Sequence, residues 1–293
     1  MSCPDCFKGS ARDGTPSGQI TTLHGLKVYL ATPPSTSTTA ASPSTILYLP
    51  DAFGYVFINN QLLADTYAAR TGMRVIIPDV VPGVGMSPDI FPLMDEFFKP
   101  IPWTNVLGKL SQAWSTLRML SIGIPFMFSS DARKAYPNVL TFARAVKAEL
   151  PAGGKLGVAG FCWGGMPSTA LCAEAKAEGS EERLIDAQFC AHPSKVQIPG
   201  AFVDAVQKFK VPYSMAAPEE DMVMSLQKVL ETEAALREKV GNGEGENGCY
   251  WEIVRYPKCK HGFAVRASPD NEVEIEAAGR ACEQAIAWFK RWL

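Results

Sequence analysis

The stretch GVAGFCWGGM, residues 157–166, places one cysteine between glycines directly after an apolar run. Gly160 stands two residues before Cys162 and Gly164 two residues after it, which gives the pattern G-x-C-x-G. A nucleophile on a sharp strand-to-helix turn needs small residues at these two places, because the backbone and the following helix approach closely there. The stretch therefore predicts an α/β sheet with Cys162 at the carboxyl end of one of its strands.

Apolar runs and helical patterns alternate along most of the remaining chain. We expect strands at 45–50, 73–80, 156–161, 184–192, 211–217 and 250–256. We expect helices at 59–71, 137–149, 163–177, 222–239 and 272–293. Such alternation is typical of a mostly parallel sheet that is covered by helices on both faces. The sequence thus predicts a single doubly wound α/β domain over residues 1–293.

Residues 83–130 interrupt this alternation. The segment carries aromatic residues among prolines and glycines, namely Phe91, Phe97, Phe98, Trp103, Trp114, Phe126 and Phe128. An aromatic-rich insertion after a strand is a candidate cap over a ligand pocket. For each ring taken alone, the alternative that it fills the core stays open.

The composition indicates a soluble globular protein. Of 293 residues, 47% are hydrophobic and 20% are charged, and the formal net charge is −2. This charge is too small to suggest binding to nucleic acid or to a membrane surface. No run approaches 18 apolar residues, and the first residues lack the apolar core of a signal peptide, so we expect a cytoplasmic protein. The composition leaves monomer and homodimer open.

The chain has eight cysteines, which are spread over its whole length. A disulfide framework is not expected in a chain this long without a secretion signal. Cys3 and Cys6 form a C-x2-C pair, but no second pair and no histidine lies near it. We therefore expect no metal site there, and interpret the pair as part of an exposed terminal segment.

Cys162 has features that favour a thiolate over a thiol. The predicted turn directs the N–H of Trp163 into the same space as the sulfur, and the N-terminus of the next helix adds positive potential. The alternative is that Cys162 is a small buried hydrophobic residue, which is the more common role of a cysteine. The glycine spacing favours the nucleophile.

A cysteine nucleophile requires a general base, and the chain has three histidines. The chain order of such turns is nucleophile, acid, histidine. His24 precedes the first core strand, and His192 has no carboxylate between itself and Cys162 on a suitable strand end. His261 follows the strand at 250–256 and is the candidate base; the alternative is a solvated loop histidine.

The acid is expected after the strand at 211–217, where Glu219, Glu220 and Asp221 follow one another. We favour Asp221, although an aspartate before a helix is also a good N-cap. An oxyanion hole needs one N–H after the nucleophile and one from the loop after the first core strand. The N–H of Trp163 is the first candidate, and that of Ala52 or Phe53 is the second.

Several segments together resemble the dienelactone hydrolases. They are DAFG (51–54), NNQLLAD (59–65), VIIPDVVPG (75–83), GFCWGG (160–165), AHPS (191–194) and KHGFAVR (260–266). The likeness runs from about residue 45 to the C-terminus, and CFKGSARDGTPSGQI (6–20) is similar to the N-terminal extension of the fungal members.

The resemblance implies an α/β-hydrolase fold and hydrolysis of a small-molecule lactone or enol ester through a thioester, with no metal or organic cofactor. It implies that Cys162 is the nucleophile, His261 the base and Asp221 the acid that orients it. It also suggests Asp51, Phe53 and Arg266 as substrate contacts. Asp51 stands where the family places a carboxylate that is hydrogen-bonded to the resting thiol, a glutamate in the bacterial enzymes. Arg266 lies one residue beyond the bacterial arginine.

Simpler alternatives exist for two of these contacts, and two other functions use the same residues. Asp51 alternatively serves as an ordinary turn residue, and Arg266 as a surface arginine. A related alternative is an esterase or thioesterase that acts on a polyketide-like intermediate. An alternative of another class is a noncatalytic protein in which Cys162 senses oxidation.

Overall fold

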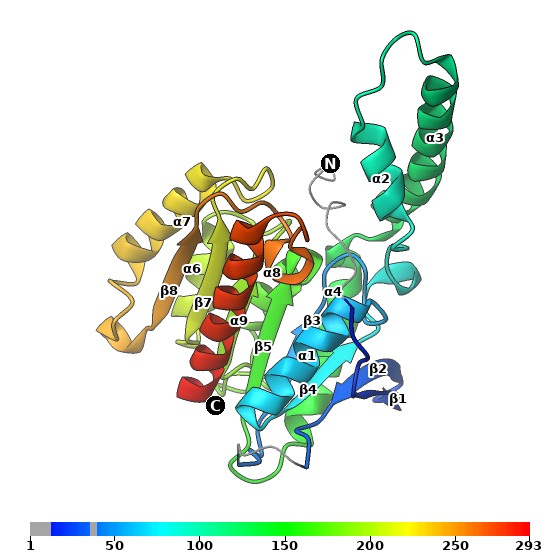
Figure 1. Ribbon diagram of the computed structural model, residues 1–293. Helices are drawn as coiled ribbons and strands as arrows, with labels where there is room; N and C mark the ends of the chain where they lie inside the picture. The colour runs from blue at the N-terminus through cyan, green and yellow to red at the C-terminus, as the bar shows by residue number, and fades with distance from the viewer. Residues whose placement is uncertain (1–12, 36–39) are drawn as a thin grey trace.

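The computed structural model describes residues 13–35 and 40–293, and its centre is one twisted sheet (Figure 1). Its strands are β1 (Gln19–Leu23), β2 (Leu26–Ala31), β3 (Thr45–Leu49), β4 (Arg74–Pro78), β5 (Leu156–Phe161), β6 (Ala187–Ala191), β7 (Tyr213–Pro218) and β8 (Trp251–Tyr256). They lie in the order β1-β2-β4-β3-β5-β6-β7-β8. From β4 to β8 all neighbours are parallel, which confirms the predicted mostly parallel sheet.

The hairpin of β1 and β2 at one edge was not predicted. Both β1–β2 and β2–β4 pair antiparallel. The hairpin turns at His24 and Gly25, whose φ angles are 48° and 81°. Two consecutive residues with positive φ are what a tight two-residue hairpin turn requires. The dipeptide His24-Gly25 between two short apolar stretches was therefore the signal in the sequence.

Helices cover both faces of the sheet, as predicted. On one face lie α1 (Ile58–Thr71), α9 (Glu272–Trp292) and the short α8 (Phe263–Arg266). On the other lie α4 (Ala132–Ala148), α5 (Gly165–Leu171), α6 (Gly200–Gln207) and α7 (Leu226–Lys239). The helix predicted at 163–177 is wrong in its length, because α5 ends at Leu171, and α6 was not predicted.

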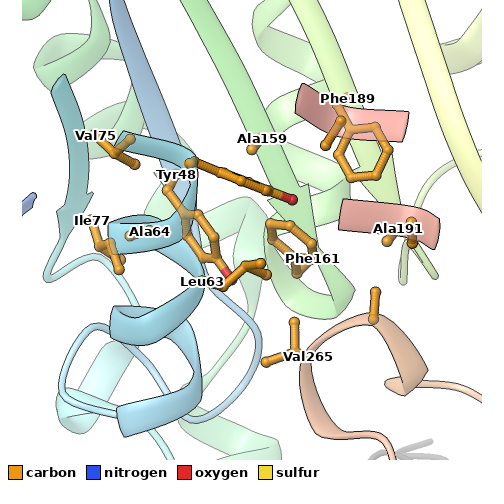
Figure 2. Packing of buried hydrophobic residues seen from close by; sticks show 14 of the residues in the cluster. Tyr48, Leu63, Ala64, Val75, Ile77, Ala159, Phe161, Phe189, Ala191 and Val265 are labelled. Atoms are coloured by element: carbon orange, nitrogen blue, oxygen red, sulfur yellow. The ribbon is translucent and has the colours of Figure 1, made fainter. Parts of the chain in front are cut away.

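Successive residues of a strand point to opposite faces, so each strand contributes to two cores. In β3, Tyr48 packs under α1 and α9, whereas Leu47 belongs to the opposite core. Figure 2 shows Tyr48, Phe161 and Phe189 on the α1 side of three neighbouring strands. The rings of Tyr48 and Phe161 are stacked with centroids 4.6 Å apart. This packing fixes the last residues of β3 and β5, from which the site is built.

The insertion forms a helical hairpin, which we call the arm. After η2 (Pro82–Val84) it consists of α2 (Ile90–Phe98) and α3 (Val106–Ser129), and it stands away from the sheet (Figure 1). Phe91 is buried and stacks on Phe53 at 4.8 Å, but Trp103 is 92% exposed. Core filling therefore accounts for Phe91 and not for Trp103, and the role of a cap stays a prediction. None of the helices described, α3 included, has the length and apolar character needed to cross a membrane.

Candidate active site

Cys162 follows β5 directly and has a φ angle of 48°, in the left-handed region that residues other than glycine rarely adopt. The close packing of the turn explains both flanking glycines. A Cβ on Gly160 would overlap the hydroxyl of Ser168 and lie 2.7 Å from the carbonyl oxygen of Gly164. A Cβ on Gly164 would lie 2.6 Å from the carbonyl carbon of Leu49 in β3. The strained turn at Cys162 is thus held by close contacts that only glycine permits.

Hydrogen bonds fix this turn from three sides. The N–H of Gly164 donates to the carbonyl of Pro50 at 3.1 Å, and the N–H of Ser194 donates to the carbonyl of Cys162 at 2.9 Å. The indole N–H of Trp163 donates to the carbonyl of Ser130 at the foot of the arm, at 2.8 Å. Cys162 itself is only 3% exposed. Segments after β3, β6 and α3 therefore determine together where the thiol lies.

The structure brings His261 and Asp221 together. Nδ1 of His261 lies 2.8 Å from Oδ2 of Asp221, and both side chains are fully buried. Oδ1 of Asp221 accepts the N–H groups of Val223 and Met224 at 2.7 and 3.1 Å. Glu220, in contrast, is exposed. Because α7 begins only at Leu226, Asp221 does not act as its N-cap.

Cys162 and Asp221 control the charge of the His261 ring. Burial alone would lower the pKa of His261, but a negative charge at Cys162, hydrogen bonds to Asp221 and Cys162, and the charge of Asp221 raise it to about 10. The imidazolium is thus the favoured form whenever the sulfur is a thiolate. The three groups can share one proton as a thiolate–imidazolium pair oriented by a carboxylate.

The loop after β3 carries the second candidate for the oxyanion hole. The N–H of Phe53 donates to Oδ1 of Asp51 at 3.1 Å, so this N–H already has a partner. Of the two alternatives, Ala52 is therefore the better candidate donor beside Trp163. The carbonyl of Ala52 accepts the N–H of Met86 at 2.8 Å, which fixes the orientation of this part of the loop.

Asp51 and Arg266 form a buried ion pair beneath this loop. Nε of Arg266 lies 2.9 Å from Oδ2 of Asp51, and neither side chain is exposed. Asn60 donates to Oδ1 of Asp51 at 3.0 Å, and the guanidinium lies 5.2 Å from the centre of the Phe53 ring. Burial raises the pKa of Asp51, and the charge of Arg266 opposes that rise. The surface-arginine alternative is therefore wrong, while substrate contacts by Asp51, Phe53 and Arg266 stay predictions.

His192 belongs to the site although the search for a base set it aside. It follows β6 with a φ of 40° and is fully buried, with its ring edge-to-face on His261 at 5.1 Å. Neither ring nitrogen has a hydrogen-bond partner among the residues that the structure describes. Burial and the nearby charges of His261 and Arg266 keep its pKa low, so the ring is neutral. Its place directly after a strand adjacent to β5 was the available signal.

The described residues contain no group of three His, Cys, Asp or Glu side chains that could hold a metal ion. Free thiols in this part of the chain are Cys162, Cys172, Cys190, Cys249, Cys259 and Cys282. Cys3 and Cys6 lie outside the described residues.

Comparisons with known proteins show what the whole chain is similar to. The model of the dienelactone hydrolase family matches residues 26–293. Hydrolase pyvD of Aspergillus violaceofuscus is 24% identical over 98% of this chain and 96% of its own. Dienlactone hydrolase 1 of Gibberella moniliformis is 26% identical over 98% of this chain and 93% of its own. Hydrolase tropI of Talaromyces stipitatus is 26% identical over 98% and 95% of the two chains.

Solved structures establish the fold. A Klebsiella pneumoniae protein named as a dienelactone hydrolase superposes with a TM-score of 0.60 at 19% identity, covering 94% of this chain and 98% of its own. XC6422 of Xanthomonas campestris, a member of the α/β serine hydrolases without a lid, gives a TM-score of 0.50 at 16% identity over 94% and 98% of the two chains. The chain therefore has the α/β-hydrolase fold.

Proposed function

Because this chain belongs to the dienelactone hydrolase family and is thus a hydrolase that acts on esters, we propose that it opens a lactone or enol ester through a thioester on Cys162. The resemblance drawn from the sequence motifs is confirmed by the match over residues 26–293. The observation that carries the proposal is the buried 2.8 Å contact of His261 with Asp221, beside a thiol on a left-handed turn.

Acylation begins from the thiolate–imidazolium pair. The sulfur of Cys162 attacks the ester carbonyl carbon, and the electron pair of the C=O bond moves to oxygen. The N–H groups of Trp163 and Ala52 bind this oxyanion. As the carbonyl re-forms, the C–O bond to the leaving group breaks, and Nε2 of His261 gives its proton to the departing enolate or alkoxide. The acyl group then remains on sulfur as a thioester.

Deacylation uses the same groups in reverse. Neutral His261 takes a proton from a water molecule, whose oxygen attacks the thioester carbonyl. The C–S bond breaks, the carboxylic acid leaves, and the thiolate–imidazolium pair is restored. Through its bond to Nδ1, Asp221 holds the ring in the tautomer that exposes Nε2 to both steps.

The chemistry of sulfur favours esters with a stabilised leaving group. A thiolate is a strong nucleophile and also a good leaving group, so the tetrahedral intermediate collapses forward only when the other group leaves at least as readily. An enolate satisfies this condition, whereas an amine from an amide does not. The preferred substrate class is therefore an enol lactone or a similarly activated ester.

Trapping of the acyl-enzyme tests this mechanism. With an aryl ester, we expect intact-protein mass spectrometry to show one acyl group per chain on Cys162 and its loss with time. Cys162→Ala should remove both the adduct and turnover, while its circular dichroism stays that of the wild type. Turnover by Cys162→Ala would overturn the assignment of the nucleophile. An adduct-free wild type that only oxidises at Cys162 would instead support the redox-sensing alternative.

The rate of alkylation tests the ion pair itself. Because the pKa of His261 is raised to about 10, we expect iodoacetamide to modify Cys162 at a rate that changes little between pH 6 and 9. The half-buried Cys282 in the same chain is the internal control, whose rate should rise with pH as its thiol loses a proton. In His261→Ala the rate at Cys162 should acquire the same rise. An unchanged profile in that variant would contradict the pairing.

A substrate panel separates the hydrolase alternatives. Enol lactones, simple aryl esters and acyl thioesters are compared at equal concentration by kcat/KM. The proposal expects enol lactones to be preferred by at least tenfold, whereas a thioesterase would prefer the acyl thioesters. All three classes should depend on Cys162, so Cys162→Ala is the blank for each.

A further inference from the structure

Helix α3 of the arm carries apolar residues on two opposite faces. Met119, Ile122 and Phe126 are partly buried and pack against a hydrophobic cluster that includes residues of α2. A helix turns by about 100° per residue, so positions two residues away from these lie on the other side. There Leu117 and Ile124 are 60% and 46% exposed. A helix that packed only on its own domain would carry polar residues on that outer face.

The outer residues follow a seven-residue repeat, which we call the outer seam. Its members are Leu107, Leu110, Trp114, Leu117, Ser121, Ile124 and Phe128. They are spaced by three and four residues in turn, and all are exposed. This is the spacing of a helix that pairs with a second helix along its length. The 24 residues of α3 make a helix about 36 Å long, and the seam runs along nearly all of it.

The outer seam is large and nearly uncharged. Charged residues within α3 are limited to Lys109 and Arg118, and neither is a member of the seam. Trp114 and Phe128 are 64% and 80% exposed, and Trp103 beside the seam is 92% exposed. With about 150–250 Å² for each such ring and less for each aliphatic side chain, the exposed apolar area is on the order of 1,000 Å². The largest patch of an ordinary monomer is about 300–600 Å².

We propose that the outer seam of α3 is the dimer interface of this protein, and that it binds the same seam of a second copy in the antiparallel direction. The exposed apolar area of the seam favours a second copy of the chain as its partner, because a stable specific interface buries about 800 Å² of each partner. The pattern is also self-complementary. Around a two-fold axis near residues 115 and 116, Trp114 meets the partner's Leu117, and Leu107 meets the partner's Ile124.

The same register also pairs apolar residues at the ends of the helix and keeps its charged residues apart. Leu110 meets the partner's Ser121, and Trp103 at the tip of the arm meets the partner's Phe128 at its foot. Arg118 lies opposite the partner's Ala113 and Lys109 opposite the partner's Ile122, so no like charges face each other across the interface. A two-fold pair of this kind uses one patch twice and closes on itself.

The pairing would bring the tip of one arm close to the catalytic turn of the other copy. Phe128 lies two residues before Ser130, whose carbonyl accepts the indole N–H of Trp163. The partner's Trp103 would therefore cover the foot of the arm next to the residue that follows the nucleophile. In the dimer, the tip of each arm thus covers the other copy's arm near the carboxyl ends of its strands.

Sedimentation equilibrium of the full chain between 1 and 100 µM tests the interface. We expect a species with the mass of two chains of 31.8 kDa. The double variant Trp114→Glu with Leu117→Glu replaces both central residues of the seam. It should raise the dissociation constant of the dimer at least a hundredfold. The matched control is Leu230→Glu with Val273→Glu, two residues that are 45% and 43% exposed outside the arm and should leave the dimer intact.

Disulfide cross-linking tests the direction of pairing. Leu110→Cys combined with Ser121→Cys should give a covalent dimer on mild oxidation, because these positions meet in the antiparallel register. Within one helix they are about 16 Å apart and cannot join. Leu110→Cys alone should stay uncross-linked, with the wild type as the blank for native cysteines. Efficient cross-linking of that single variant would indicate parallel helices and overturn the proposed register.

Three results would overturn the interface. The first is a monomeric wild type at 100 µM, and the second is a dimer that survives the two glutamates in the seam. The third is a monomer that co-sediments with vesicles of phosphatidylcholine and phosphatidylglycerol through the seam, which would assign this face to lipid. Circular dichroism of each variant distinguishes loss of pairing from loss of folding.

Discussion

Replacing Arg266 by methionine would leave the carboxylate of Asp51 in its buried place without a cation beside it. In the native protein Nε of Arg266 lies 2.9 Å from Oδ2 of Asp51, with both side chains fully buried. Methionine keeps much of the length and volume of the arginine stem. The substitution therefore removes mainly the charge and its hydrogen bonds.

The expected loss of folding stability is large because the buried carboxylate of Asp51 cannot reach water. Removing one partner of a buried ion pair costs about 3–5 kcal/mol, whereas removing both costs much less. Burial already raises the pKa of Asp51, and the loss of Arg266 would raise it further. A carboxyl group whose pKa is higher in the folded state stabilises the fold below its unfolded pKa of about 3.9 and loses that contribution as the pH rises. The free energy of unfolding of Arg266→Met should therefore be lowest at alkaline pH.

Urea unfolding at pH 5.5 and pH 8.0, followed by circular dichroism, measures this effect. We expect Arg266→Met to lose about 3–5 kcal/mol at pH 8.0 and clearly less at pH 5.5. Adding Asp51→Asn should recover most of the loss and remove the dependence on pH. The control is Arg70→Met, whose exposed ion pair with Glu283 should contribute about 0–1 kcal/mol. A loss below 1 kcal/mol for Arg266→Met, or an equal loss at both pH values, would refute the reasoning.

Substitutions at two further positions of the site, Gly160 and His192, test its packing. Gly160→Ala would place a Cβ against Ser168 and should destabilise the fold by about 1–3 kcal/mol or prevent folding. The control is Gly123→Ala, which meets no neighbouring atom in helix α3 and should stabilise the fold by up to about 1 kcal/mol. Thermal melting compares the two variants. His192→Phe keeps the edge contact with His261 and should retain both the stability and the pH profile of alkylation at Cys162. His192→Ala loses that contact and should lower the melting temperature. An alkylation profile shifted by His192→Phe would show that His192 takes part in the proton transfer.

The tight turn at Cys162 could be predicted from the sequence because its requirements are local. Gly160 and Gly164 are spaced by the turn itself, and the contacts that demand them lie within a few residues or on the next strand. The acid was harder, since three consecutive carboxylates follow β7 and no periodicity says which one points inward. In the fold Asp221 is buried against His261, whereas Glu220 is exposed.

Pairings between distant residues could not be predicted in the same way. Asp51 and Arg266 were both singled out, but as separate candidates for contact with substrate. They are 215 positions apart, and only the order of strands in the sheet brings their loops together. His192 shows the same limit, because its contact with His261 arises from the adjacency of the strand ends and not from its neighbours in AHPS.

The arm shows a different limit, which concerns what a sequence pattern can distinguish. The aromatic residues of 83–130 suggested a cap, and Phe91 does pack on the loop after β3. An apolar residue in a helix, however, is equally consistent with an intramolecular and an intermolecular contact. Only the exposure of Trp103, Trp114 and Phe128 in the folded chain separates the two cases.

The position of the two proposed oxyanion donors depends on packing that lies outside the three proposed catalytic groups. Gly164 holds the turn after β5 against Leu49 and Pro50, immediately before the loop that carries Ala52. Asp51 holds the same loop from beneath through the N–H of Phe53 and is itself held by Arg266. Because the two N–H groups act only if both segments keep their spacing, loss of the buried ion pair should lower kcat more than it raises KM. The stability and the chemistry of this site therefore rest on the same contacts.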